Sequence, residues 1–144
     1  MSPERIHQLR NIFMQTALQF ATMSFATRKK VGAIIVKNGS IISTGWNGLP
    51  SGMPNELIET WSDESQEMIT HPLVIHAEKN AINKCLEHNL NIEGCDMYIT
   101  LSPCVDCARA TIAAGIKHVF YRTQYSNTEG IEFLLDNDVS VTRI

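Results

Sequence analysis

Residues 102–107 read SPCVDC, in which Cys104 and Cys107 stand three positions apart. A pair at this spacing can bind a metal, carry out redox chemistry, form a disulfide or have no function. The residues before it predict a strand over 96–100, and those after it predict a helix over about 104–114. Both sulfurs then face the same way at a helix N-terminus, where the partial positive charge favours thiolates.

Outward from this pair, apolar spacing and turn residues predict the other elements. Asn38-Gly39 suits a tight turn between two apolar segments, which indicates a hairpin. A hairpin followed by alternating helices and strands predicts an α/β layer with a mixed, roughly five-stranded sheet. We expect helices over about 3–26, 74–88, 104–114 and 128–137, strands over 31–36, 41–46, 96–100, 117–121 and 139–143, and an irregular functional loop over 47–70.

The composition is that of a globular protein. The chain has 144 residues, 44% of them apolar and 19% charged, so we expect one domain over 1–144. The formal charge of −3 and the lack of a basic tail argue against a nucleic acid polymer as partner. The first residues have no apolar signal core, and no uncharged run could span a membrane. We therefore expect a cytoplasmic protein (host cytoplasm if viral), where paired cysteines more often bind metal or do redox work than form disulfides.

Two thiolates at this spacing could be ligands of a zinc ion, but they supply only half of a zinc site. Cys85 lies in the middle of a predicted helix and is expected to be a buried apolar residue, and Cys95 has no visible partner. His76, at the start of a predicted helix, is the better third ligand for zinc beside Cys104 and Cys107. Three ligands leave the fourth position for water, as in a catalytic zinc site.

Glu78 stands two positions after His76 and is within reach of anything that the metal binds. Residues 76–78 (HAE) and 103–107 (PCVDC) match H-x-E…P-C-x-x-C, the signature of zinc nucleobase deaminases. The alternatives are a core histidine beside an unrelated thiol pair, or a non-catalytic zinc module. A structural zinc site has no use for the free carboxylate of Glu78, which argues against the module.

Three stretches carry a family resemblance: GWNGLPSG (45–52), HAEKNAI (76–82) and TLSPCVDCARATIAAGIK (100–117). With them, the whole chain resembles the cytidine deaminase superfamily and especially the deoxycytidylate (dCMP) deaminases. The resemblance implies a three-layer α/β/α cytidine deaminase-like fold, one catalytic Zn²⁺, and hydrolysis of dCMP to dUMP and ammonia, with Glu78 moving the protons. The tRNA adenosine deaminases remain the alternative, but they have a shorter connection in place of residues 53–75.

The resemblance also implies substrate contacts. Asn47 resembles a family asparagine that touches the base or sugar; it could also, or only, be a turn residue with positive φ. Ala77, Ser102 and Tyr125 are the other expected contacts. Ser102 could donate to the substrate or shape the turn before the cysteines, and Tyr125 could equally be a packing residue.

Regulation is the last expectation. In the dCMP deaminases that the glycine-rich stretch resembles, a triphosphate binds there, dCTP activates, dTTP inhibits and the enzyme is a hexamer. A plain surface turn is the alternative for this stretch. The run Arg28-Lys29-Lys30 could bind phosphate or could simply be solvated. We expect small nucleotides (dCMP, dCTP, dTTP) as ligands, Mg²⁺ with the triphosphate, a homo-oligomer, and an effector site formed by Arg28, Lys30, Gly45, Asn47, Gly48 and Gly52.

Overall fold

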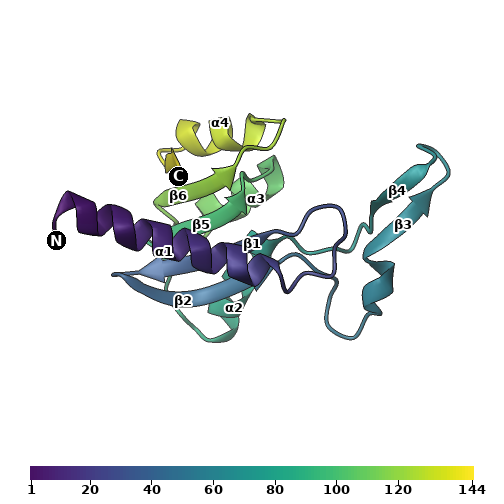
Figure 1. Cartoon of the computed structure of the whole chain (residues 1–144), viewed down its shortest axis with the longest axis horizontal. Coiled ribbons are helices and arrows are strands. Elements are labelled where there is room, and N and C mark those ends of the chain that lie inside the picture. Colours follow the sequence, from purple (N-terminus) through teal and green to yellow (C-terminus); the bar gives the residue numbers. More distant parts are fainter.

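A computed structural model describes all residues 1–144, and a mixed five-stranded sheet lies at its centre (Figure 1). The strand order is β2-β1-β5-β6-β7, with the hairpin β1–β2 antiparallel, β5 antiparallel to β1, and β6 and β7 parallel to β5. The mixed sheet confirms the predicted fold class. The strands are β1 (Gly32–Lys37), β2 (Ser40–Trp46), β5 (Asp96–Leu101), β6 (His118–Thr123) and β7 (Ser140–Arg143).

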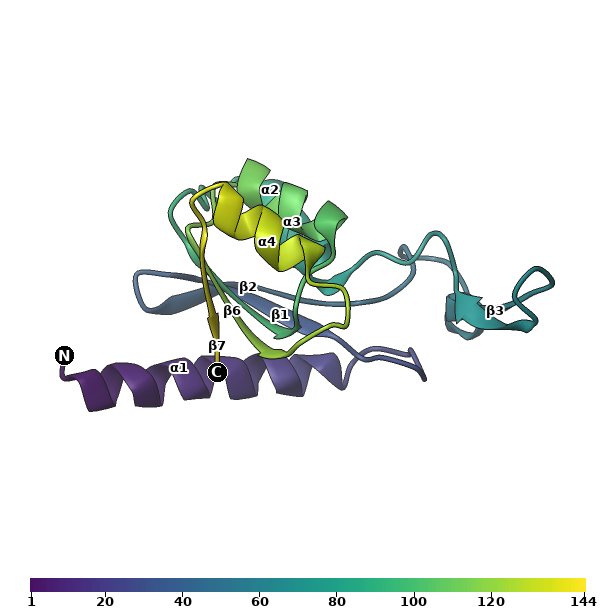
Figure 2. The ribbon, with the colours of Figure 1, turned by 90° about the horizontal axis from the view of Figure 1, so that it is seen from above.

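Helices cover both faces of this sheet, which gives three layers (Figure 2). Helix α1 (Pro3–Ala21) lies alone on one face. The opposite face carries α2 (Ala77–Glu87), α3 (Val105–Ala113) and α4 (Glu129–Asp136). No helix is long and apolar enough to cross a bilayer.

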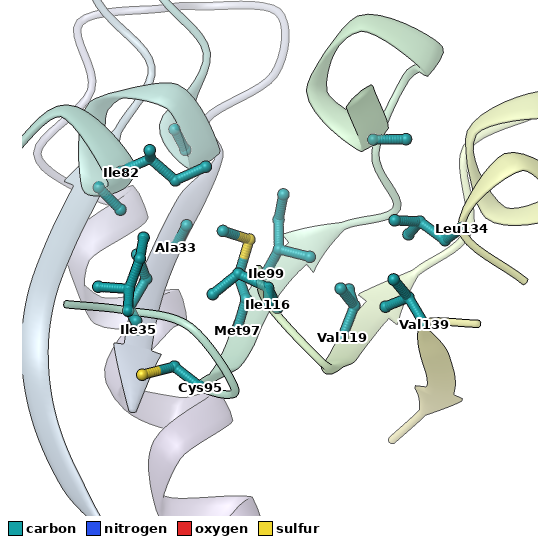
Figure 3. Packing of buried hydrophobic residues seen from close by; sticks show 14 of the residues in the cluster. Ala33, Ile35, Ile82, Cys95, Met97, Ile99, Ile116, Val119, Leu134 and Val139 are labelled. Atoms are coloured by element: carbon teal, nitrogen blue, oxygen red, sulfur yellow. The ribbon is translucent and has the colours of Figure 1, made fainter. Parts of the chain in front are cut away.

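Strand β5 shows how the residue pattern builds these layers. Met97 and Ile99 point into the apolar cluster between the sheet and α2, α3 and α4 (Figure 3). Tyr98 points to the other face and packs against Phe13 of α1 and Phe120 of β6, with ring centroids 5.3 and 4.5 Å apart. Alternate residues of one strand therefore pack into the two cores, which explains why Met97, Tyr98 and Ile99 are consecutive apolar residues.

The first helix is shorter than predicted. Ser2 caps its start as expected, but the helix ends at Ala21 and not at about residue 26. The hydroxyl of Ser24 instead donates to the carbonyl of Asn47 at 2.8 Å and accepts the N–H of Ala26 at 3.1 Å. The contact with Asn47, just after β2, and the local bond to Ala26 replace helical geometry here, although the apolar spacing continues to Ser24.

The segment predicted as an irregular loop over 47–70 is only partly irregular. It contains a 3₁₀ helix (Asn55–Ile58) and a hairpin of β3 (Glu59–Ser62) and β4 (Glu67–Thr70), which projects from the body as an arm (Figure 1). All residues of the two strands are exposed or half-buried, so the sequence carries no alternation of buried apolar and exposed polar residues that would reveal them.

One carboxylate fastens this arm to the body. Glu59 accepts hydrogen bonds from the backbone N–H of Thr27 at 2.8 Å and of Arg28 at 3.1 Å, and from the Thr27 hydroxyl. The Arg28 guanidinium in turn donates to the carbonyl of Met68 at 3.0 Å. The arm and the loop between α1 and β1 therefore hold each other.

Candidate active site

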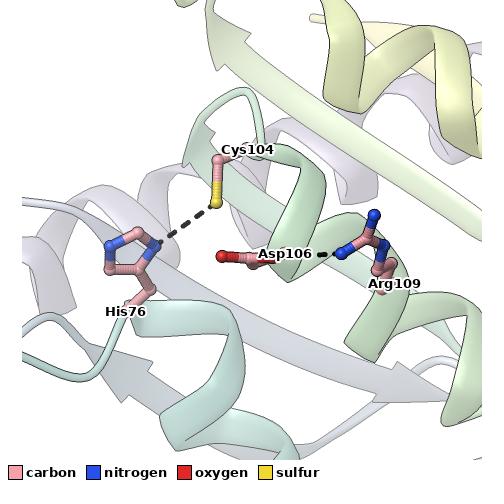
Figure 4. Close-up of polar contacts among 4 residues, drawn as sticks. All are labelled: His76, Cys104, Asp106 and Arg109. Atoms are coloured by element: carbon pink, nitrogen blue, oxygen red, sulfur yellow. Dashed lines mark hydrogen bonds and ion pairs between the residues drawn. The ribbon is translucent and has the colours of Figure 1, made fainter.

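The three predicted metal ligands lie together at the starts of two neighbouring helices. His76 caps the N-terminus of α2, Cys104 caps that of α3, and Cys107 lies in the first turn of α3. Figure 4 shows the His76 ring facing the Cys104 sulfur. His76 Nδ1 lies 3.1 Å from Cys107 Sγ and 3.7 Å from Cys104 Sγ, and all three ligand atoms lie within 4.8 Å of one another.

This geometry fits a zinc ion. Tetrahedral zinc with ordinary Zn–N and Zn–S bonds places a nitrogen and a sulfur ligand about 3.6 Å apart. The two observed N–S distances, 3.1 and 3.7 Å, lie close to that value. One imidazole and two thiolates are donors that zinc prefers, and a set of three leaves one position for water.

The two thiols are electrostatically unequal. The hydrogen bond from Cys107 lowers the pKa of Cys104 to about 3, and the bond with His76 adds to this effect. The pKa of Cys107 is raised, first by its bond to Cys104 and then by burial. The pKa of His76 is also raised, chiefly by its bond to Cys104. In the absence of metal the negative charge of the pair is therefore favoured on Cys104, and a bound metal would displace the proton of Cys107.

Glu78 lies in the first turn of α2 beside this cluster. Its side chain is buried, and burial raises its pKa to about 7. It forms no ion pair, since the one ion pair of the chain joins Arg109 to Asp106 (Figure 4). A buried carboxyl that exchanges its proton near neutral pH is suited to general acid–base chemistry.

A cavity of about 330 Å³ opens onto the cluster, within the size range of small-ligand sites. All four predicted substrate contacts line it: Asn47, Ala77, Ser102 and Tyr125. Of the residues predicted for an effector, Asn47 and Arg28 line it too, while Lys30, Gly45, Gly48 and Gly52 do not.

The side chain of Asn47 is engaged within the chain. Its Oδ1 accepts the N–H of Val31 at 2.9 Å, and its Nδ2 donates to the carbonyl of Lys29 at 2.9 Å. Its own N–H donates to the carbonyl of Val31 at 3.2 Å. The alternative of a positive-φ turn residue is wrong, because Asn47 is absent from the residues with positive φ. It ties the end of β2 to the segment before β1.

Ser102 connects the cysteine segment to Tyr125. Its hydroxyl, in a buried side chain, accepts the N–H of Tyr125 at 2.6 Å. The Tyr125 ring lies under the ammonium of Lys29, with Nζ 4.6 Å from the ring centroid. Ser102 therefore does shape the local turn, and its hydroxyl hydrogen is left to donate elsewhere.

The glycine-rich stretch is built differently from the expected phosphate loop. At Gly45 a Cβ would meet the carbonyl of Ala77 and lie 2.7 Å from the N of Ala81, so this glycine lets α2 pack against β2. Gly48 pairs with Ile75 through both its N–H and its carbonyl, at 3.1 and 2.8 Å. The backbone N–H groups of Asn47 and Gly48 are therefore engaged within the chain and are not free to bind a phosphate. Gly52 has a φ of 93°, and a Cβ there would meet no atom within 4 Å.

Sequence reasoning missed Glu59 as the anchor of the arm, and it considered Lys29 only as one member of the run Arg28-Lys29-Lys30, not as a cation of this cavity. Glu59 is 32 positions from Thr27, and no local pattern predicts so distant a partner. Cys85 and Cys95 are buried in the core cluster, as expected of Cys85.

Comparison with known proteins agrees with this geometry. A family model described as the cytidine and deoxycytidylate deaminase zinc-binding region matches residues 7–123. The deoxycytidylate deaminase of Enterobacteria phage T2 is 36% identical over an alignment of 162 positions that covers 85% of this chain and 86% of that enzyme. The deoxycytidylate deaminase of Mus musculus is 36% identical over 120 residues, but this chain spans only 66% of its length.

A solved structure matches the whole chain. The crystal structure of dCMP deaminase from the cyanophage S-TIM5 in complex with dCMP and dUMP superposes with a TM-score of 0.85 at 41% identity, covering 100% of this chain and 99% of that one. With the H-x-E and P-C-x-x-C residues gathered around one cavity, these matches show that the chain belongs to the cytidine and deoxycytidylate deaminase zinc-binding family.

Proposed function

We propose that the protein hydrolyses dCMP to dUMP and ammonia with one zinc ion per chain. The observation that carries this proposal is the buried Glu78 beside the His76, Cys104 and Cys107 cluster, at a cavity of about 330 Å³. The similarity over the full length of the cyanophage protein, which is described with dCMP and dUMP bound, supports the choice of substrate.

The chemistry divides between the metal and the chain. When bound, zinc supplies the Lewis acidity that makes a water molecule nucleophilic at neutral pH. Glu78 accepts a proton from this water as its oxygen bonds to C4 of cytosine, and passes the proton to ring N3. Glu78 then transfers the remaining proton of the water oxygen, now bonded to C4, to the exocyclic nitrogen. The C4–N4 bond breaks, and ammonia leaves. Water and dCMP thus give dUMP and ammonia, with no change of oxidation state.

Residues of the cavity wall would orient the base. Ser102 has a hydroxyl hydrogen left to donate, because its oxygen already accepts from Tyr125. Ala77, buried at the start of α2, offers no side chain that would obstruct a base next to Glu78. Tyr125 supplies an aromatic wall. Asn47 would contact the substrate through an amide that also holds the segment at Lys29 and Val31.

Ammonia release from three substrates tests the proposal: dCMP, deoxycytidine and an RNA hairpin that carries an adenosine. We expect turnover of dCMP and none of the hairpin, because the chain carries a net charge of −3. Faster deamination of the RNA adenosine than of dCMP would overturn the proposal in favour of a polynucleotide-editing enzyme.

We further propose regulation by triphosphates in a homo-oligomer, a hexamer in the dCMP deaminases that the chain resembles. Arg28 and Lys30 are exposed cations, and Gly52 leaves open space for a phosphate that Mg²⁺ would accompany. Exposed apolar side chains such as Ile12, Phe25 and Trp61 supply surface for self-association. We propose the cytoplasm, or a host cytoplasm, as the location because free nucleotides are the ligands.

A further inference from the structure

Lys29 is a cation of the cavity wall that no other group of the chain neutralises. Two cations line the cavity, and Arg28 uses its guanidinium to hold the carbonyl of Met68 at 3.0 Å. Lys29 forms no hydrogen bond through its ammonium and no ion pair. The ammonium instead lies over the ring of Tyr125, with Nζ 4.6 Å from the ring centroid.

The carboxylate nearest to this loop is not available to Lys29. Glu59 lines the same cavity, but its two oxygens accept from the N–H groups of Thr27 and Arg28 and from the Thr27 hydroxyl. The cavity wall therefore combines a satisfied carboxylate with an unpaired ammonium, and an anionic ligand group can pair with that ammonium without displacing an internal partner.

Two contacts keep Lys29 at the cavity. Asn47 Nδ2 donates to the carbonyl of Lys29 at 2.9 Å, and Glu59 fastens the two residues before it. The ammonium lies over the ring of Tyr125, and the N–H of Tyr125 donates to Ser102 at 2.6 Å, in the segment that carries Cys104. Lys29, Tyr125 and Cys104 line one cavity of about 330 Å³, so a ligand that fills this cavity from the metal ligands can meet the ammonium.

We propose that Lys29 binds the 5′-phosphate of the substrate and sets the preference for a nucleoside monophosphate over a nucleoside. This inference rests on the proposed function, since it concerns the same cavity. A charge-assisted hydrogen bond to a phosphate oxygen is stronger than the contact of an ammonium with an aromatic face, so the phosphate draws Lys29 away from Tyr125. Deoxycytidine, without a phosphate, has no such contact to gain or lose.

The test compares kcat/KM for dCMP and for deoxycytidine in the wild type and in Lys29→Met, Lys29→Arg and Lys117→Met. Lys117 is exposed and outside the cavity, so its change matches the loss of charge without the loss of the site. We expect Lys29→Met to lower kcat/KM for dCMP about ten- to a hundredfold, mostly through KM, and to leave deoxycytidine unchanged. Lys29→Arg should retain most of the preference, and Lys117→Met all of it.

Calorimetric binding of dUMP and deoxyuridine gives a second readout that needs no turnover. Wild-type affinity for dUMP should fall as salt is added, and Lys29→Met should bind dUMP no better than deoxyuridine. Equal dCMP-to-deoxycytidine ratios in wild type and Lys29→Met, or equal losses on both substrates, would overturn the role of Lys29 and leave the deaminase proposal standing. A wild type that binds dUMP through Lys29 but deaminates neither substrate would instead overturn the proposed function.

Discussion

Nδ1 of His76 lies 3.1 Å from Sγ of Cys107, although 31 positions separate the two residues in the sequence. The contact exists because α2 and α3 begin side by side, each with a ligand at its N-cap. Close packing around Gly130 supports this arrangement, because a Cβ there would meet the carbonyl of Pro103 and lie 2.9 Å from the carbonyl carbon of Cys104. Helix α4 therefore packs directly against the backbone of Pro103 and Cys104.

Loss of either thiolate should remove the metal. Purified protein should contain about one zinc per chain, and Cys104→Ala or Cys107→Ala should lose zinc and melting temperature together, because metal binding contributes to folding. Elemental analysis and thermal unfolding measure the two effects. Cys85→Ala is the control, since Cys85 is buried in the core and is not a ligand. This variant should keep its zinc and lose some stability. A full zinc complement in the double variant of Cys104 and Cys107 would disprove the assignment.

Asn47 should contribute to stability as well as to substrate contact. Asn47→Ala removes its side-chain hydrogen bonds to Val31 and Lys29, so we expect the free energy of unfolding to fall by about 1–3 kcal/mol. Urea unfolding measures the change. Asn137→Ala, which removes one exposed bond to Phe133, should cause a smaller loss. An unchanged free energy of unfolding in Asn47→Ala, with a raised KM, would mean that the amide serves the substrate alone.

Two glycines of the same stretch should respond differently to alanine. Gly45→Ala places a methyl group against the backbone of Ala77 and Ala81, and we expect it to destabilise the fold by about 1–3 kcal/mol or more. Gly48→Ala meets no atom within 4 Å and should leave stability nearly unchanged. Chemical unfolding of the two variants side by side checks this, and equal losses would show that the close approach of α2 to β2 is not what requires Gly45.

The regulatory proposal predicts a specific form of kinetics. The rate against dCMP concentration should be sigmoidal, more so with dTTP, and should approach a hyperbola with dCTP, because the two effectors would favour different quaternary states. Steady-state rates with each triphosphate and light-scattering mass measurements test the switch and the assembly. A hyperbolic curve that neither triphosphate changes would remove the regulation and leave the catalytic proposal intact.

The sequence predicted the core of this fold well because its signals are local. Asn38 and Gly39 both have positive φ in the β1–β2 turn, as their dipeptide indicates, and the apolar runs of β5 and β6 are buried strands. The H-x-E and P-C-x-x-C residues carry their chemistry in fixed spacings, so the three ligands could be named before their distances were known.

The arm and the loop that it holds could not be predicted in this way. All residues of β3 and β4 are exposed or half-buried, and the contact that positions them joins Glu59 to Thr27 across 32 positions. In the sequence, Lys29 is one of three consecutive cations. Only the spatial contacts distinguish it: Arg28 donates to the carbonyl of Met68, whereas the ammonium of Lys29 lies over the ring of Tyr125.

The role of Glu78 as the proton carrier is the central claim, and dUMP formation from dCMP by Glu78→Gln at equal zinc content tests it most directly. Glutamine keeps the size and burial of the side chain but cannot accept the proton of water, and His76, Cys104 and Cys107 are untouched. We expect the variant to bind zinc as the wild type does and to lose turnover by at least about 10²- to 10⁴-fold. Turnover by the zinc-loaded variant within a few-fold of the wild type would contradict the account.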